Sequence, residues 1–242
     1  MRFGEIRNRQ GERLDYTYLE GNPDLKKIVV VGHGVTGNKD RPFLLALTDG
    51  VQKAGLNALR FSFSGNGESE GTFVDSTISK EVTDLGSVLD AVSGYEITYV
   101  GHSMGGAVGV LRASSDDRIG RLISLAGMVH TEQFAQTEFG EEEPDKGCMW
   151  EEPDCPLSSN YMNDMAAIHS VVEKGSDIKV PWLLIHGTED DVVPIQDSLD
   201  IFEKAVCPKE LFRIEGANHV FSETHTEPMV QKVVEWVRGQ FS

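Results

Sequence analysis

The chain has 242 residues, 39% of them hydrophobic and 25% charged, which is ordinary for a globular protein of one or two domains. Its formal net charge of −17 disfavours nucleic acid and anionic lipid surfaces as partners. The sequence shows no signal peptide and no apolar run long enough to span a bilayer, and its three cysteines are too few for a disulfide framework. We therefore expect a cytoplasmic protein that binds neither nucleic acid nor membranes; Cys148 and Cys155 could pair if the chain were exported. The oligomeric state stays open, a homo-oligomer included.

Short apolar runs alternate with helical patterns along most of the chain. The runs are continuous, which is typical of strands buried on both faces of a parallel sheet between helices. Segments 2–8 and 13–19 indicate an antiparallel hairpin at the sheet edge. In chain order, we expect further strands at 26–34, 57–65, 96–101, 121–127, 182–187 and 210–216, and helices at 42–53, 82–92, 104–113, 194–205 and 227–238.

The interval 128–180 breaks this alternation. It contains no strand signal but has an acidic stretch, followed by a predicted helix that would carry His169. A structureless interval of this length would be unusual in a compact domain. We interpret it as an inserted cap over one end of the sheet, with 1–127 and 181–242 forming the core domain. The apolar face of the predicted helix comprises Tyr161, Met165, Ile168 and Val172.

The third predicted core strand runs into Gly-His-Ser-Met-Gly, and a helix is expected directly after it. G-x-S-x-G between a strand and a helix is typical of a nucleophile elbow, a tight turn that presents a serine side chain. Gly101 and Gly105 lack the Cβ atoms that would clash where strand and helix converge. We therefore interpret Ser103 as a nucleophile and the Met104 N–H as a donor to an oxyanion. The structural alternative is a small polar helix cap.

A serine nucleophile needs a base and a carboxylate that orients the base. His219 follows the last predicted strand; His225, the nearest rival, lies further from the strand end. Asp190 follows the preceding strand and is preferred over its neighbour Asp191, which would point elsewhere in an extended loop. The order Ser103, Asp190, His219 is that of α/β-hydrolases.

The loop after the first core strand has two interpretations. A His-Gly pair at this point predicts a second oxyanion donor, the N–H of Val35. However, Gly32, Gly34 and Gly37 also match the dinucleotide-binding pattern G-x-G-x-x-G. The ribose-binding acid of that pattern is missing, and four residues, 38–41, separate its glycines from the next predicted helix. We therefore expect no dinucleotide, no other organic cofactor and no metal.

Five segments of the chain resemble the α/β-hydrolase superfamily, and more narrowly bacterial esterases of the cinnamoyl/feruloyl group and serine-aminopeptidase-like hydrolases. The resemblance implies an α/β-hydrolase fold in which Ser103 is the nucleophile, His219 the base and Asp190 its orienting group. It also implies that Val35 and Met104 supply the oxyanion donors and that the cap 128–180 binds part of the substrate. The five segments are HGVTGNKD, RFSFSGNGESEGTF, VGHSMGG, LIHGTEDDVVP and IEGANHVFS.

These residues predict a carboxylesterase that cleaves a small-molecule ester through an acyl-enzyme, with cinnamoyl or feruloyl esters among the candidates. An amide or peptide hydrolase, a thioesterase or an acyltransferase would use the same triad, because the chemistry up to the acyl-enzyme is shared. A non-catalytic ligand receptor with this fold is a further alternative. The acidic stretch of the cap could attract a cationic substrate, although a solvated acidic loop is the simpler interpretation.

Overall fold

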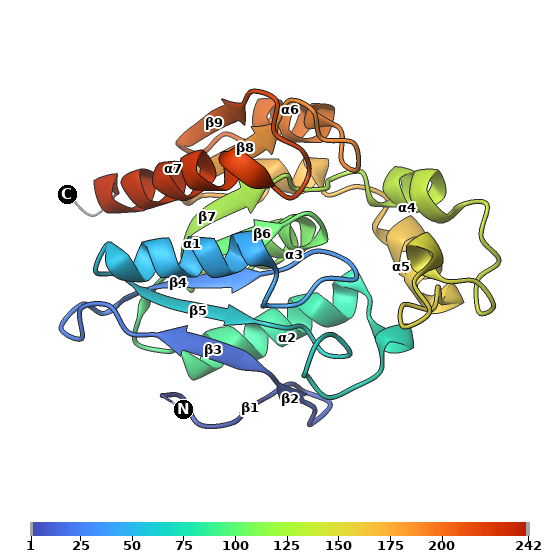
Figure 1. The fold of residues 1–242 in the computed structure, drawn as a ribbon, viewed down its shortest axis with the longest axis horizontal. Coiled ribbons are helices and arrows are strands. Elements are labelled where there is room, and N and C mark those ends of the chain that lie inside the picture. Colours follow the sequence, from blue (N-terminus) through green and yellow to red (C-terminus); the bar gives the residue numbers. More distant parts are fainter. Residues whose placement is uncertain (1, 241–242) are drawn as a thin grey trace.

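A seven-stranded sheet runs through the middle of the molecule in the computed structural model, which describes residues 2–240 (Figure 1). Its strands are β3 (Tyr16–Leu19), β4 (Lys27–Gly32), β5 (Asn57–Phe61), β6 (Glu96–His102), β7 (Ile119–Leu125), β8 (Trp182–Gly187) and β9 (Lys209–Ile214). They lie in the order β3-β5-β4-β6-β7-β8-β9. β3 is antiparallel to β5, and all other neighbours are parallel. The predicted α/β fold with a mostly parallel sheet is confirmed.

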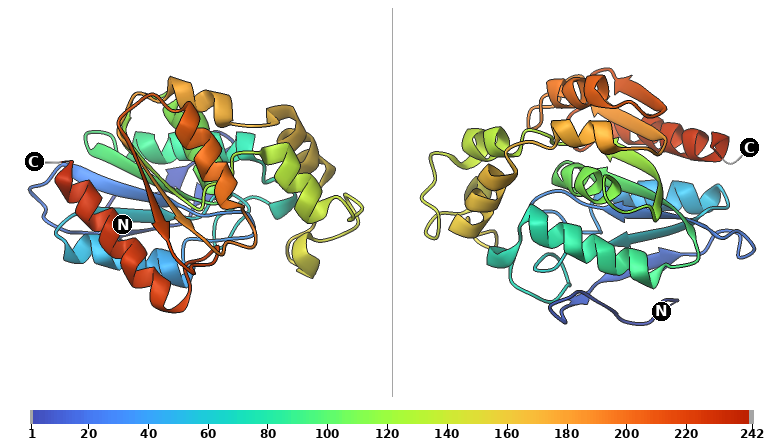
Figure 2. Two further views of the ribbon diagram at one scale, coloured as in Figure 1. Left: turned by 90° about the horizontal axis from the view of Figure 1, so that it is seen from above. Right: turned by 180° about the vertical axis from the view of Figure 1, so that it is seen from behind.

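Helices cover both faces of this sheet (Figures 1 and 2). α1 (Pro42–Lys53) and α7 (Thr226–Gly239) lie on one face, and α2 (Ile78–Ala91), α3 (Met104–Ala113) and α6 (Ile195–Lys204) lie on the other. In β4, Val29 and Val31 pack toward α1 and α7, whereas Ile28 and Val30 pack into the opposite core. Since successive side chains of a strand point to opposite faces, a strand covered on both sides is apolar throughout.

Most of the interval 128–180 lies beyond one end of the sheet (Figure 1), but its residues 172–177 pack against α6 on one face of the sheet. It contains α4 (Thr131–Phe139), η2 (Met149–Glu151), α5 (Ser159–Ile168) and η3 (Val172–Asp177). Phe139, Tyr161 and Met165 are buried and join the core on the α2 and α3 side. The predicted helix ends earlier than expected: His169 caps α5 with a φ of 59°, and Val172 belongs to η3. α4 was not predicted, because its sequence is too polar to show a helical stripe.

The N-terminal hairpin is confirmed as an antiparallel pair, and its second segment, 13–19, reaches the predicted sheet edge through β3, but the paired strands themselves lie outside the main sheet. β1 (Ile6–Arg7) and β2 (Arg13–Leu14) form a separate two-stranded sheet, whereas β3 is one of the two edge strands of the main sheet. The side chain of Asn8 links this pair to α2, since its Nδ2 donates to Asp84 Oδ1 at 2.9 Å. The remaining short helices are η1 (Phe73–Asp75) and η4 (Glu223–His225).

The start of α2 also differs from the prediction, with consequences for stability. The helix begins at Ile78, before the predicted 82, because the Thr77 side chain accepts a hydrogen bond from the Lys80 N–H at 3.1 Å. The extra turn contains Glu81, which is buried. Its Oε2 has no hydrogen-bond partner within residues 2–240. Burial, and then repulsion from Asp84 and Asp164, raise the pKa of Glu81 well above its usual value.

We predict that Glu81→Gln stabilises the protein at pH 7 to 8. Because the folded-state pKa is raised, the unfolded chain releases its proton first, and the wild type loses stability as pH rises above the ordinary glutamate pKa of about 4.3. Glutamine does not titrate, so the gain should shrink toward zero as pH falls to that value. Each gain of about 1 kcal/mol should raise Tm by roughly 2–4 °C. Thermal melts of Glu235→Gln, an exposed control with the same charge change, should match the wild type; an equal shift in both variants contradicts the prediction.

Candidate active site

Ser103 occupies a strained turn between β6 and α3. Its φ is 53° and its ψ is −120°, a conformation that costs a non-glycine residue about 1–3 kcal/mol. The turn is held from both sides, because the Ser103 N–H donates to Leu125 O at 2.9 Å and the Ser103 carbonyl accepts from Met128 N at 3.1 Å. A Cβ at Gly101 would lie 2.1 Å from Gly105 O, so a larger residue would push strand and helix apart.

His219 and Asp190 form a hydrogen-bonded pair after β9 and β8. His219 Nδ1 lies 2.9 Å from Asp190 Oδ2 and 3.1 Å from Oδ1. The carboxylate is completely buried, and it also accepts from the N–H groups of Val192 and Val193 at 3.0 and 2.8 Å. His186 Nε2 lies 3.2 Å from Asp190 Oδ2.

The donors around Asp190 decide its charge. Burial alone would raise the pKa of this carboxyl, but hydrogen bonds from His186 and His219 outweigh it and hold the pKa well below its usual range. Asp190 is therefore an anion at neutral pH, facing the Nδ1 side of the His219 ring. Asp191 is exposed, and His225 does not line the cavity that Ser103 and His219 share.

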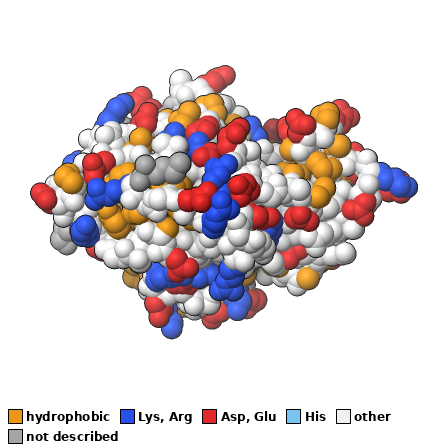
Figure 3. Space-filling view, turned by 90° about the horizontal axis from the view of Figure 1, so that it is seen from below, with side chains coloured by type: hydrophobic (Ala, Val, Ile, Leu, Met, Phe, Trp, Pro, Cys, Tyr) orange, Lys and Arg blue, Asp and Glu red, His pale blue; other side chains and the backbone are white. Residues whose placement is uncertain are grey.

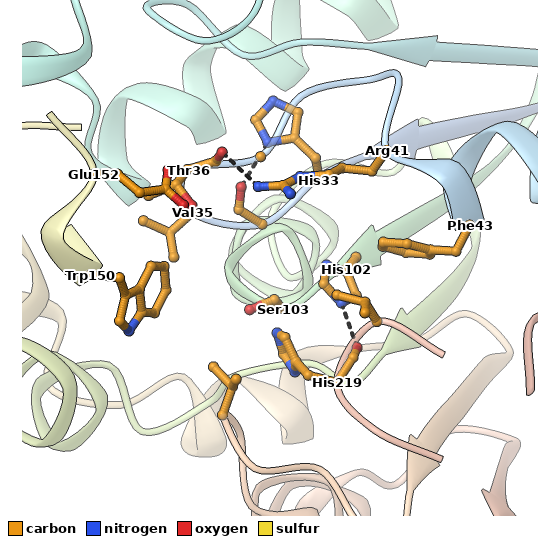
Figure 4. A pocket seen from close by; sticks show the side chains of 14 residues that line it. His33, Val35, Thr36, Arg41, Phe43, His102, Ser103, Trp150, Glu152 and His219 are labelled. Atoms are coloured by element: carbon orange, nitrogen blue, oxygen red, sulfur yellow. Dashed lines mark hydrogen bonds between the residues drawn. The ribbon is translucent and has the colours of Figure 1, made fainter. Parts of the chain in front are cut away.

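Ser103 and His219 face one cavity of about 320 Å³ (Figure 4). Ser103 follows β6, His219 follows β9, and both strands are part of the parallel sheet, so the two side chains meet at the same sheet edge. Within residues 2–240 no hydrogen bond joins Ser103 Oγ to the ring, a looseness common before substrate is bound. The cavity is also lined by Val35, Arg41, Phe43, Trp150, Glu152, Val192 and Val220.

The loop after β4 passes directly over Ser103. A Cβ at Gly34 would lie 2.7 Å from Ser103 Cβ, so only glycine permits this approach. His33 fixes the loop, since its Nε2 accepts from Phe63 N at 3.0 Å and its Nδ1 lies 2.8 Å from Gly34 O. The backbone N–H groups of Val35 and Met104 donate to no acceptor within residues 2–240. Gly34 therefore serves the approach to Ser103, whereas a Cβ at Gly32 would meet the Tyr99 hydroxyl and one at Gly37 the Gly34 carbonyl oxygen. α1 begins only at Pro42.

His33 and His102, which lie beside glycines of the motifs, are buried and make contacts that no local sequence pattern predicts. His102 Nε2 lies 2.9 Å from the carbonyl oxygen of His219, and its ring packs between Phe43 and the His219 ring with centroids 4.7 Å from each. Burial lowers the pKa of His33 to about 4 and that of His102 to about 3, so both are neutral at pH 7. A neutral His102 donates its Nε2 proton to the His219 carbonyl, which ties the serine turn to the loop that holds His219.

Several lining residues had no signal in the sequence. Arg41 and Phe43 come from the start of α1, and Trp150 and Glu152 come from the interval 128–180. Trp150 has a φ of 49° and packs edge-on against Phe139 with ring centroids 4.9 Å apart. Their convergence depends on tertiary packing, which no local pattern reports.

The described residues also bear on metal binding, on disulfide bonds and on membrane-spanning helices. Residues 2–240 contain no cluster of three His, Cys, Asp or Glu side chains placed to hold a metal ion. Cys148, Cys155 and Cys207 are free thiols. None of the described helices combines the length and the apolar character needed to cross a bilayer.

Sequence comparisons relate the chain to known hydrolases. Residues 81–242, more than half of the chain, match the prolyl oligopeptidase family. The rat mitochondrial palmitoyl-protein thioesterase ABHD10 is 24% identical over 225 residues, which cover 87% of this chain and 74% of the rat protein. The human ABHD10 match covers 67% of this chain and 56% of the human protein. The chain thus spans little more than half to three quarters of these relatives.

Solved structures share the fold over almost the whole chain. Est1E from Butyrivibrio proteoclasticus with bound ferulic acid superposes with a TM-score of 0.87 and 25% identity, covering 98% of both chains. Mouse ABHD10 has a TM-score of 0.82 and 20% identity, also covering 98% of both chains. The family match shows that the chain belongs to the prolyl oligopeptidase family. Together with the structural likeness and the serine turn, it identifies the chain as a serine hydrolase of the α/β-hydrolase superfamily.

Proposed function

We propose that the protein is a carboxylic ester hydrolase that works through an acyl-enzyme, with Ser103 as nucleophile, His219 as base and Asp190 as its orienting group. One observation carries the proposal: the strained Ser103 and the His219 ring share a cavity, and Nδ1 of that ring is hydrogen-bonded to the buried carboxylate of Asp190. The carboxylate fixes the ring orientation and stabilises the imidazolium that forms when His219 takes a proton.

The reaction proceeds in two halves. Ser103 Oγ attacks the carbonyl carbon of the ester while His219 Nε2 takes the hydroxyl proton. The N–H groups of Val35 and Met104, which have no other acceptor within residues 2–240, hold the oxyanion. Collapse of the intermediate expels the alkoxide, which receives the proton from His219. Water then attacks the acyl-enzyme, His219 takes the water proton, and the acid leaves as Ser103 regains its hydrogen.

The cavity favours a small apolar acyl or phenolic group. Its walls include Val35, Phe43, Val192 and Val220 from the core, with Trp150 from the interval 128–180, which we propose acts as the substrate-binding cap. A volume of about 320 Å³ lies at the low end for ligand pockets, and it suits a short acyl chain or one aromatic ring. The ferulic acid bound by Est1E is of this kind.

A thioesterase is the second candidate, because the ABHD10 relatives are named palmitoyl-protein thioesterases. A side-by-side assay of p-nitrophenyl butyrate, methyl ferulate, butyryl-thiocholine and an aminoacyl p-nitroanilide separates ester, thioester and amide cleavage. We expect the oxygen esters to be cleaved fastest. The ABHD10 relatives are also named mitochondrial, and the cytoplasmic location stays a prediction for this chain.

We predict that Ser103→Ala lowers kcat for p-nitrophenyl butyrate by about 10³-fold or more, because the covalent route is lost. A fluorophosphonate probe should label the wild type at one site and leave Ser103→Ala unlabelled. A variant that keeps its activity would remove Ser103 from the mechanism. A folded wild type that neither reacts with the probe nor turns over would instead favour the ligand-receptor alternative.

We predict that Asp190→Asn lowers kcat by about 10²–10⁴-fold with little change in KM, because a neutral amide cannot stabilise the imidazolium. Asp191→Asn is a matched control, since the neighbouring aspartate is exposed and the charge change is identical. Steady-state kinetics should leave Asp191→Asn within about twofold of the wild type. The reverse ranking would transfer the orienting role to Asp191.

We predict a positioning role for His102, which holds the loop of the base through the His219 carbonyl. His102→Leu removes the donor and should lower kcat by about 10–100-fold with KM nearly unchanged, since small displacements of a catalytic group are costly. His102→Gln keeps an N–H donor and should recover much of that loss. If the two variants are equally impaired, the effect comes from packing and the positioning role is wrong.

A further inference from the structure

Arg41 stands out among the residues that line the cavity, because it is a cation in a chain with 39 acidic and 22 basic residues. Its side chain reaches the cavity from the residue just before α1 (Figure 4). The guanidinium makes one hydrogen bond, from Nη2 to Thr36 O at 3.0 Å. It forms no ion pair with any carboxylate in the part of the chain from 2 to 240.

The cations around Arg41 are neutralised. Lys39 is paired with Asp15 at 3.2 Å and with Asp40 at 2.6 Å, and Arg60 is paired with Asp40 at 3.3 Å. The same holds on the face around β1 to β3, where basic and acidic side chains lie next to one another (Figure 3). In so acidic a protein, an arginine without a carboxylate partner at the nucleophile's cavity has donors left for a ligand.

The chemistry of the guanidinium defines that ligand. Arginine has five N–H donors in a rigid fork, and the bond to Thr36 uses one of them. The fork matches the two oxygens of a carboxylate or a phosphate, and such charge-assisted pairs are about twice as strong as neutral hydrogen bonds. Apolar walls together with one free guanidinium therefore suit a substrate that has an apolar body and one anionic group.

The position of Arg41 is tied to the reaction site. Thr36, whose carbonyl holds the guanidinium, directly follows Val35, the proposed oxyanion donor. The Arg41 backbone is also fixed, because its carbonyl accepts from Leu44 N and Leu45 N at the start of α1. An anion bound by Arg41 would thus lie on the same side of the cavity as the loop that contacts Ser103.

Glu152 is the acidic group of the same cavity, and it does not neutralise Arg41. Its Oε2 lies 3.5 Å from the thiol of Cys155, and no ion pair joins it to Arg41. Since this carboxylate lines the cavity, it repels an anionic substrate and sets a limit on the preference that Arg41 creates.

We propose that Arg41 is a specificity-determining residue that selects substrates with a carboxylate or phosphate near the scissile bond. This inference rests on the proposed esterase function and names its substrate class. The anion could belong to the acyl part or to the alcohol part of the ester, and the substrates of the test distinguish these two sources.

The test compares pairs of esters that differ only in charge. The acyl-side pair is p-nitrophenyl hydrogen succinate and its methyl ester; the alcohol-side pair is 4-butyryloxybenzoic acid and its methyl ester. For each pair, the measured quantity is kcat/KM of the charged ester divided by kcat/KM of the neutral ester. In the pair whose carboxylate reaches Arg41, the substitution Arg41→Gln should lower this ratio by about 10–100-fold. Glu152→Gln should raise that ratio several-fold. Arg9→Gln, an exposed control with the same charge change, should leave it unchanged.

A binding measurement keeps the inference separate from the esterase proposal. Calorimetry would measure the binding of monobutyl succinate and of butyl 4-carboxyphenyl ether to the Ser103→Ala variant. For one of these two anions, adding Arg41→Gln should increase Kd by about 10–100-fold. Such a loss in a protein that hydrolyses no ester would support the anion site while contradicting the proposed function. If Arg41→Gln leaves both Kd values and both kcat/KM ratios unchanged, the anion site is wrong, whatever the turnover of the wild type.

Discussion

The strained turn at Ser103 is the constraint on which the rest of the structure depends. A φ of 53° is unfavourable for serine, and it persists because three elements fix it together. Leu125 at the end of β7 accepts its N–H, Met128 in the following loop donates to its carbonyl, and α3 starts directly after it. The convergence of strand, helix and loop thus offsets the local cost, and the serine side chain is left facing the cavity.

The electrostatic arrangement follows from the same geometry. The site buries one anion, Asp190, and satisfies it with two backbone N–H groups and two imidazoles. His33 and His102 are buried without a charged partner, so they stay neutral, and their hydrogen bonds hold the loops around Ser103 in place. The negative charge of Asp190 therefore lies behind His219, where the proposed mechanism needs it, and the guanidinium of Arg41 reaches the same cavity beside Thr36.

The parts of the site that are predictable from sequence are those with a local pattern. α1 matches its predicted bounds because Pro42 suits the first helical turn, and the elbow at Ser103 is visible from its flanking glycines. The start of α2 was missed because its capping residue, Thr77, precedes the apolar stripe.

Contacts between distant segments had no such pattern. The bond from His102 to the His219 carbonyl spans 117 residues, and the bond from Asn8 to Asp84, which links the hairpin to α2, spans 76. Trp150 enters the cavity through a backbone conformation that a tryptophan rarely adopts. These features emerge only when the core has packed, so periodicity and motif spacing could not report them.

The central claim is that Ser103 is transiently acylated, and peptide mapping by mass spectrometry after acid quench tests it most directly. The enzyme would be mixed with excess p-nitrophenyl butyrate, quenched within milliseconds and digested at low pH. The account predicts one butyryl group on the peptide that contains Ser103, appearing together with a burst of nitrophenol. Turnover with no modified peptide, or with the acyl group on another residue, would contradict it.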